Sequence, residues 1–280
     1  MSQPNANPPI VLSFSVLDPS GAGGIQASIE TAASLGCHSA PVITAMCATG
    51  AAPNTETLAT APTLVIEQAR SILDEMDVAA INVGFVGSLA NAEAIHSILN
   101  DYDHIPAVSH PALCFLDEAN AEHNDLIDAY NNLILPLSHI ASFSLFEARK
   151  ISHESDTVDT TAHVIVSSGC ENIVITGTGK HTKAFQNSVF NTKGLVKNFY
   201  WEQEPANCHG SSSTLSMAMA SYLAHGFEPA QAIEQAQNFT WQAMCASRDM
   251  GFGRRSPHRF YWADKNIKNS SNKPPSSTSH

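Results

Sequence analysis

The chain has 280 residues, of which 43% are hydrophobic and only 14% are charged, against roughly 25% in an ordinary soluble protein. The formal net charge is −12, and residues 1–148 contain a single basic residue, Arg70, beside sixteen carboxylates. This composition argues against nucleic acid and against an anionic membrane as partners, because both require basic surfaces.

The first nine residues lack the basic segment of a signal peptide, so we expect no secretion. Residues 31–55 carry no charge, but prolines, glycines and hydroxyls interrupt them, which favours a buried strand with loops over a membrane span. The six cysteines lie far apart without a CxxC pair, as expected of reduced thiols in the cytoplasm.

The first half of the chain alternates between strand and helix patterns. An apolar alternating run over 10–16 predicts a strand, and a glycine-rich turn over 18–24 leads into a helix over 25–35. Further strands are predicted over 41–46, 79–84 and 105–109, and helices over 62–76 and 90–100.

The second half continues the pattern. We expect helices over 125–136 and 156–168, strands over 139–145 and 172–176, and antiparallel strands over 183–200. Helices over 213–225 and 229–247 are separated by Gly226 and Pro229, a stop and a start signal. The alternation predicts an α/β fold with a mostly parallel central sheet and helices on both faces. One domain is expected over residues 10–262, followed by a disordered polar tail over 265–280.

Two turns stand where such a sheet binds ligands, beyond the carboxyl ends of its strands. In the first, over residues 18–24, glycines permit close approach of a ligand and Asp18 can accept hydrogen bonds. The second, over residues 209–214, places a glycine and four hydroxyls at the start of a helix, which favours an anion site without a lysine. A tight turn capped by Asp18 and an ordinary serine-rich helix cap explain the same residues without a ligand.

Two well-defined catalytic motifs, the P-loop and the nucleophile elbow, are present only in part. Residues 177–180 resemble the end of a P-loop, but Val174 and His181 break it. Thr214 stands where a nucleophile elbow closes with glycine, which disfavours an esterase.

Together the two turns resemble blocks of the hydroxymethylpyrimidine/phosphomethylpyrimidine kinases of thiamine biosynthesis, which belong to the ribokinase-like vitamin kinases. Residues 18–27, Asp-Pro-Ser-Gly-Ala-Gly-Gly-Ile-Gln-Ala, are similar to the family's DPSGGAGIQA. Residues 209–216, His-Gly-Ser-Ser-Ser-Thr-Leu-Ser, are similar to its HGTGCTLS. Residues 251–253 and 258–262 resemble its C-terminal glycine and His-Phe-aromatic segment, so the resemblance spans residues 10–262.

The resemblance implies a ribokinase-like three-layer sandwich, a homodimer, and phosphorylation of 4-amino-5-hydroxymethyl-2-methylpyrimidine and then of its monophosphate, with ATP and Mg²⁺. It implies a catalytic anion hole of Gly210, Ser211, Ser212 and Ser213, and Glu147 in the acidic place of an NxxE magnesium motif. The remaining implied positions are substrate-binding Asp18, Gly21, Thr49, Phe85 and His110, and nucleotide-binding Ser144, Thr176, Thr178 and Lys180.

Several positions depart from the family. Ser213 replaces the catalytic cysteine, and Thr49 replaces a glutamine that reads the aminopyrimidine. His110 replaces an aspartate, Ser144 replaces the NxxE asparagine, and Lys180 is the nearest substitute for a phosphate-side lysine. Phosphoryl transfer depends more on positioning and charge neutralisation than on the base, so a weak base costs only about 10²-fold or somewhat more.

Three functions therefore stay open. The first is a divergent pyrimidine kinase, and the second is a related vitamin kinase, for example one that acts on pyridoxal, favoured by Thr49. The third is a non-catalytic relative that binds a pyrimidine or thiamine-related ligand, favoured by the number of substitutions. Cys208 and His209 are further candidates for the base.

Overall fold

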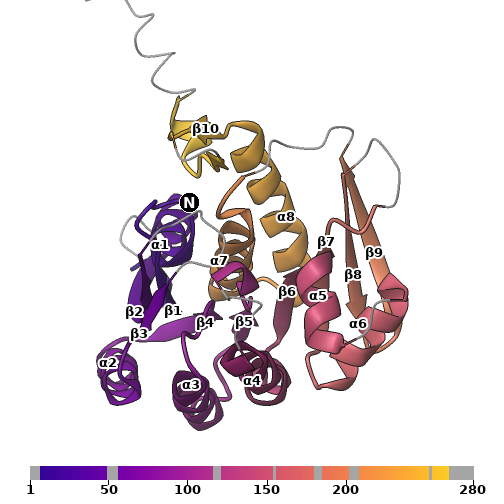
Figure 1. Ribbon diagram of the computed structural model, residues 1–280. Coiled ribbons are helices and arrows are strands. Elements are labelled where there is room, and N and C mark those ends of the chain that lie inside the picture. The colour runs from indigo at the N-terminus through magenta and orange to yellow at the C-terminus, as the bar shows by residue number, and fades with distance from the viewer. Residues whose placement is uncertain are drawn as a thin grey trace, which may run out of the picture.

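A nine-stranded sheet runs through the protein (Figure 1). The computed structural model describes residues 7–48, 56–115, 121–153, 156–179, 185–201, 208–251 and 254–264. The strand order is β3-β2-β1-β4-β5-β6-β7-β8-β9. The strands are β1 (Ile10–Leu17), β2 (His38–Cys47), β3 (Thr57–Ala59), β4 (Val78–Val83), β5 (Ala107–Ser109), β6 (Ile140–Ser144), β7 (Asn172–Thr176), β8 (Phe185–Asn191) and β9 (Gly194–Trp201).

The six strands β2, β1, β4, β5, β6 and β7 are mutually parallel, whereas β3, β8 and β9 join antiparallel at the two sides. The carboxyl ends of the parallel strands therefore share one edge of the sheet. In register, Phe14 of β1 lies beside Val83 of β4, and Val83 lies beside Ser109 of β5. The turns that follow β1, β4, β5, β6 and β7 consequently meet at this edge.

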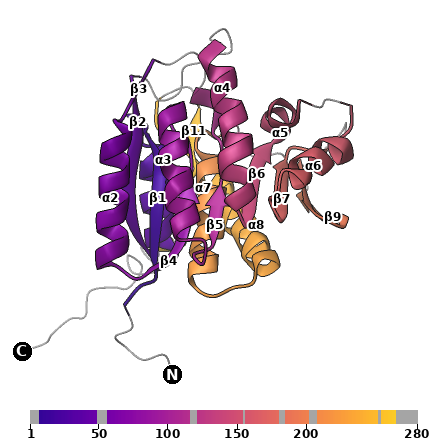
Figure 2. The ribbon, with the colours of Figure 1, turned by 90° about the horizontal axis from the view of Figure 1, so that it is seen from below.

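Helices cover both faces of the sheet (Figure 2). One face carries α1 (Gly24–Ser34), α7 (Ser211–Ala224) and α8 (Pro229–Cys245). The other carries α2 (Pro62–Glu75), α3 (Leu89–Asp101), α4 (Ala121–Ala129), α5 (Leu145–Ser152) and α6 (Val158–Ser167). Each face buries its own apolar cluster, which confirms the predicted three-layer α/β fold.

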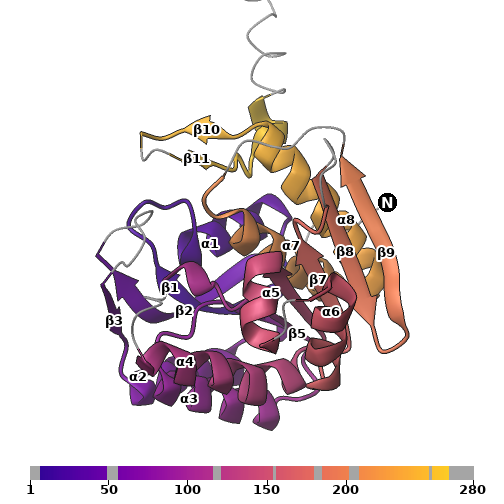
Figure 3. The same ribbon diagram turned by 45° about the vertical axis from the view of Figure 1, so that its right-hand side comes forward.

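A C-terminal hairpin completes the described chain. Strands β10 (Arg248–Asp249) and β11 (Arg255–Ser256) pair antiparallel and form a separate small sheet. Figure 3 shows this hairpin beside α1, above the main sheet in that view. The hairpin thus returns the end of the chain to the first helix.

The helix expected over 125–136 begins earlier, at Ala121, and ends in a π-helical turn, Tyr130–Ile134, and a 3₁₀ turn, Leu135–Leu137. Pro136 lacks an amide donor, which explains why the regular helix cannot continue there. Helix α5 and strand β3 were not predicted. No described helix is long and apolar enough to cross a membrane. The tail expected over 265–280 lies outside the described residues.

A polar chain crosses the core beneath the carboxyl edge. The Ser216 hydroxyl of α7 donates to Asn82 Oδ1 of β4 at 2.6 Å, and Asn82 Nδ2 donates to the Ser13 hydroxyl of β1 at 3.3 Å. All three side chains are buried, so each depends on the others to satisfy its polar atoms. These hydrogen bonds fix α7 against the two central strands β1 and β4.

Replacing Ser216 by alanine leaves the buried Asn82 carbonyl without this donor. We expect the free energy of unfolding, measured by urea denaturation, to fall by about 1–3 kcal/mol. The control Ser167→Ala removes an exposed hydroxyl of α6 and should change it by no more than about 0.5 kcal/mol. If the two substitutions lower the free energy of unfolding equally, the hydrogen bond from Ser216 to Asn82 does not stabilise the fold.

Candidate functional site

Two turns meet at the carboxyl edge of the sheet: the first turn, residues 18–24 after β1, and the second turn, residues 208–210 before α7. Gly210 has a φ of +85°, and a Cβ there would lie 1.7 Å from the Ala22 carbonyl oxygen. A Cβ on Gly23 would lie 3.3 Å from His209 Nε2. Only glycine at position 210 allows the two turns to approach so closely.

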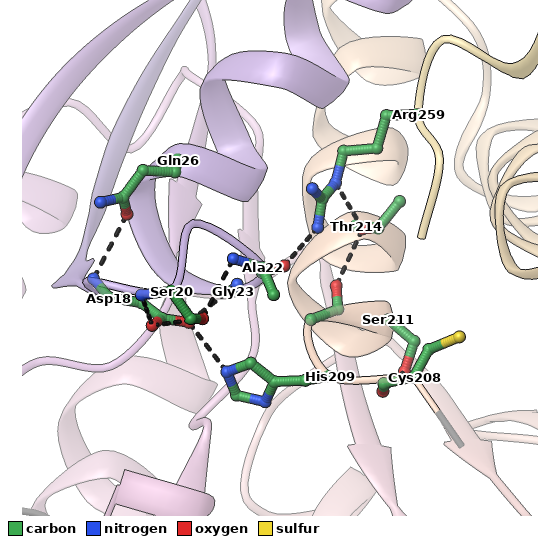
Figure 4. Close-up of polar contacts among 11 residues, drawn as sticks. Asp18, Ser20, Ala22, Gly23, Gln26, Cys208, His209, Ser211, Thr214 and Arg259 are labelled. Carbon is green, nitrogen blue, oxygen red and sulfur yellow. Dashed lines mark hydrogen bonds and ion pairs between the residues drawn. The ribbon is translucent and has the colours of Figure 1, made fainter. Parts of the chain in front are cut away.

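Asp18 joins the two turns (Figure 4). One carboxylate oxygen accepts hydrogen bonds from the Ser20 amide and hydroxyl, and the other accepts from the Gly23 amide at 2.9 Å and His209 Nε2 at 2.8 Å. Burial alone would raise the pKa of Asp18, but the hydrogen bonds from His209 and Ser20 outweigh it and hold the pKa below its usual value. Asp18 is therefore a buried carboxylate that already has four donors.

Arg259 joins the first turn to α7 (Figure 4). Its guanidinium is fully buried and donates to the Thr214 hydroxyl of α7 at 3.0 Å, to Glu30 of α1 at 2.8 Å, and to the Ala22 carbonyl. Burial lowers the pKa of Arg259, and the hydrogen bond and charge of Glu30 counter that shift. One side chain thus connects the first turn, the first helical turn of α7, and α1.

A cavity of about 310 Å³ opens beside the second turn, and we name it the site cavity. It is bounded by the end of β5, the start of α5, the second turn and the C-terminal hairpin. The residues around it are Gly23, His110, Ala112, Cys114, Phe115, Ser144, Phe146, Glu147, Cys208, His209, Gly210, Ser211, Ser212, Ser213 and Arg254. All four predicted anion-hole residues and predicted Glu147 therefore face one space.

The start of α7 presents unpaired amides. Gly210 precedes the helix in a left-handed conformation and offers no side-chain cap. The first intrahelical backbone bond runs from the Thr214 amide to the Gly210 carbonyl at 3.0 Å. The amides of residues 211–213 thus have no partner within the helix, and the helix dipole makes this end attractive to an anion.

Glu147 is held rigidly at the start of α5. Its Oε2 accepts from the Ser144 amide and hydroxyl, each at 2.8 Å, and its Oε1 accepts from the Leu113 amide at 3.0 Å. The Ser144 hydroxyl in turn accepts from the Glu147 amide, which completes a capping box. The carboxylate is buried, and its fixed position ties β6 and α5 to the chain after β5.

The positions implied for substrate binding do not share one space. His110 borders the site cavity, and its Nδ1 lies 3.2 Å from the Ser142 carbonyl. Phe85 is buried and packs on Phe115, with ring centroids 5.5 Å apart. Gly21 borders a different cavity of about 300 Å³, between the first turn and the hairpin. Thr49 lies outside the described residues.

The positions implied for the nucleotide are also divided. Ser144 borders the site cavity, whereas Thr176 borders a smaller cavity of about 50 Å³ that it shares with Ser211 and Ser212. The far wall of the smaller cavity is a stack of Trp201 on Trp241 with ring centroids 4.9 Å apart. Thr178 is buried, with its hydroxyl 2.7 Å from that of Ser188, and Lys180 lies outside the described residues.

The candidates for the base are weakly suited to accept a proton. Burial raises the pKa of the Cys208 thiol, so this group stays protonated near neutral pH. His209 directs Nε2 at the Asp18 carboxylate. Ser213 is a neutral hydroxyl.

Sequence reasoning assigned no role to Arg259 or Arg254. Arg259 belongs to the C-terminal segment that resembles the family, and this resemblance was the one sequence feature that could have pointed to a role for it. Its partners Ala22 and Glu30 lie more than 200 residues away in sequence, so spacing could not identify them. Among the described residues no cluster of three acidic, histidine or cysteine side chains could hold a metal ion.

The lowered pKa of Asp18 makes stability depend on pH. Its stabilising contribution is present above the unfolded-state value near 3.8 and is lost as pH falls through the folded-state pKa, which lies below that value. We expect Asp18→Asn to flatten the fall in unfolding free energy below about pH 4, measured by urea denaturation. The control Glu67→Gln, in exposed α2, should keep the wild-type pH profile; a wild-type profile for Asp18→Asn would contradict the assignment.

Solved structures share the architecture. The structure of an ADP complex of pyridoxal kinase from Bacillus subtilis superposes with a TM-score of 0.83 at 22% identity, covering 91% of this chain and 98% of that chain. Phosphomethylpyrimidine kinase from Clostridium difficile gives a TM-score of 0.69 at 21% identity, covering 84% of this chain and 99% of that chain. These likenesses confirm the fold.

Comparison with known sequences identifies the family of this chain. A hydroxymethylpyrimidine/phosphomethylpyrimidine kinase from Rhizobium meliloti is 27% identical over 264 residues, which cover 91% of this chain and 99% of the relative. The family model described as phosphomethylpyrimidine kinase matches residues 18–258, from the aspartate of the first turn to the histidine before Arg259. Because that match covers most of the chain and includes both turns, the chain belongs to the phosphomethylpyrimidine kinase family.

Proposed function

We propose that this protein transfers the γ-phosphoryl group of ATP to the hydroxymethyl group of 4-amino-5-hydroxymethyl-2-methylpyrimidine, and then to the resulting monophosphate. The observation that carries the proposal is the site cavity, which is lined both by the first residues of α7, whose amides have no partner within the helix, and by Glu147. Family membership supports the same reaction, as does the name of the Rhizobium meliloti relative. The contacts of Asp18 and Arg259 explain how the amides are kept in place.

The amides of Ser211, Ser212 and Ser213 suit the transferred group. In the reaction, the substrate hydroxyl oxygen bonds to the γ-phosphorus, the bond from phosphorus to the bridging oxygen breaks, and ADP leaves with the electron pair. The hydroxyl proton passes to a base or to water. Charge spreads over the phosphoryl oxygens in the transition state, where amide donors and a helix N-terminus stabilise it.

Ser213 limits the proton transfer but need not abolish turnover. A hydroxyl accepts a proton much less readily than a thiolate, and neither protonated Cys208 nor His209, bound to Asp18, replaces the family's cysteine directly. Because the transition state is loose, little negative charge builds on the attacking oxygen, and positioning carries most of the catalysis. We therefore propose a slow kinase.

The residues around the site cavity fit a magnesium ion that arrives with the nucleotide. Mg²⁺ usually keeps several waters and is bound by one or two carboxylates together with substrate phosphates. Glu147 supplies one carboxylate of fixed orientation, and the described residues offer no complete protein cage. The bound ion would neutralise phosphate charge, while Glu147 would fix where the triphosphate lies.

Thr176 and the smaller cavity support a place for the rest of the nucleotide. This cavity continues from Ser211 and Ser212 toward the aromatic stack of Trp201 and Trp241. Aromatic faces stack on planar bases. The solved Bacillus subtilis pyridoxal kinase is an ADP complex, which supports ATP as the donor. A cytoplasmic homodimer that binds neither nucleic acid nor membrane remains part of the proposal.

A pyridoxal-type kinase is the second candidate. Its support is the structural likeness to pyridoxal kinases, together with the ring of Phe115, which lines the site cavity, packs on Phe85 and would suit either heterocycle. A non-catalytic ligand-binding relative is the third. Competition between the pyrimidine and pyridoxal as substrates distinguishes the two kinases from each other. Measurable turnover of ATP distinguishes both kinases from the non-catalytic relative.

We expect a coupled ADP-release assay to show ATP-dependent phosphorylation of the hydroxymethylpyrimidine, with pyridoxal as the competing substrate. A phosphate acceptor preference for pyridoxal would support the second candidate. Calorimetric binding of the pyrimidine without affinity for ATP or Mg²⁺, and without turnover above the Ser213→Ala variant, would favour the non-catalytic candidate and overturn the proposal.

Restoring a thiol at position 213 should accelerate the reaction. We expect Ser213→Cys to raise kcat by up to about 10²-fold, because a thiolate accepts the hydroxyl proton far better than a hydroxyl does. Steady-state kinetics across pH 6–9, a range of about three units around the ordinary thiol pKa, should show the gain growing with pH.

The matched control is Ser212→Cys, which places the same thiol one residue earlier in the same cavity. It should give no comparable gain. If both thiols act alike, or Ser213→Cys has no effect at any pH, position 213 does not face the reacting hydroxyl.

A further inference from the structure

The positive charge at the site cavity comes from an unexpected part of the chain. The first half contributes no basic side chain there, because its one arginine, Arg70, is paired with Asp101 at 2.7 Å between α2 and α3. Among the described residues that border the cavity, Arg254 is the only arginine or lysine. Phosphoryl transfer needs a cation near the transferred group.

The backbone beside Arg254 is fixed to the second turn. The next residue, Arg255, begins β11, and its carbonyl accepts from the His209 amide at 2.9 Å. Cys208 and Arg255 form an isolated parallel bridge, and the Arg255 guanidinium donates to the Ser247 carbonyl. Position 254 therefore stays beside the start of α7 rather than varying with a free loop.

The side chain of Arg254 is exposed and has no hydrogen bond or ion pair with any described residue. Other arginines nearby are committed: Arg248 pairs with Asp264 at 2.6 Å, and Arg259 pairs with Glu30 at 2.8 Å. Keeping a guanidinium unpaired at the mouth of a polar cavity leaves its donors available to a ligand.

We propose that Arg254 is a catalytic residue that contacts the phosphoryl oxygens of ATP opposite Glu147, and that it supplies the cationic charge at the phosphate side of the site. This inference rests on the proposed function. Arginine binds phosphate through two parallel hydrogen bonds and keeps its proton throughout, so no covalent bond changes on it. The α7 amides and Arg254 then enclose the transferred group from two sides.

Binding and turnover of Arg254→Ala and Arg254→Lys test the assignment. We expect Arg254→Ala to weaken calorimetric binding of AMP-PCP about tenfold or more and to lower kcat for the pyrimidine by about 10²-fold, a modest share of the effect of arginine fingers. Arg254→Lys should fall between this variant and wild type, because lysine keeps the charge but loses the planar pair of donors.

The matched control is Arg70→Ala, which removes the same charge from the exposed surface of α2 and should bind and turn over as wild type does. Thermal unfolding of each variant checks that the fold is retained. Wild-type AMP-PCP affinity in Arg254→Ala overturns the role of Arg254 and leaves the proposed function standing. Wild-type binding of AMP-PCP without phosphorylation of any substrate overturns the proposed function, while the affinities still decide the role of Arg254. Absence of AMP-PCP binding by wild type overturns both.

Discussion

The close contact between the first and second turns is the constraint on which the site depends. Gly210 lies so near the Ala22 carbonyl that no Cβ fits between them, and the buried side chains of Asp18 and Arg259 close the contact from opposite sides. Residues from β1, α1, α7 and the C-terminal segment are thereby held in one geometry. Because α7 starts directly after Gly210, the same contact determines where its unpaired amides point.

The electrostatics of the site follow from this arrangement. A half-chain with one arginine cannot neutralise phosphate with side chains, and the proposed anion site instead combines helix amides with a cation from the C-terminal hairpin. Asp18 is acidic and lies beside the site, but its carboxylate accepts four hydrogen bonds. These donors offset part of its negative charge, so it repels a phosphate less than a free carboxylate would. Glu147 is likewise bound by amides, which leaves it a fixed point rather than a mobile charge.

Much of the architecture was predictable, because strand and helix periodicities differ and the helices have clear start and stop signals. The glycine before the second helix signal also predicted that a helix starts beside the first turn, and Gly210 does precede α7; the anion hole assigned to this helix start remains a proposal. Helix α5 was missed although Ser144 and Glu147 show the Ser-x-x-Glu spacing of a capping box, since the same residues had been interpreted only as a magnesium motif. The role implied for Asp18 at the pyrimidine remains a prediction, and its four structural donors could not be inferred locally. Arg259 and Arg254 depend on contacts between distant segments, which no local pattern reports.

The central claim is that the start of α7, positioned by the two turns, holds the transferred phosphoryl group. A crystal structure of the protein with AMP-PCP, Mg²⁺ and the hydroxymethylpyrimidine tests it most directly. We predict terminal phosphate oxygens within hydrogen-bond distance of the amides of Ser211, Ser212 and Ser213, with the two turns in contact as described. A terminal phosphate bound elsewhere, with these amides facing only solvent, would contradict the claim.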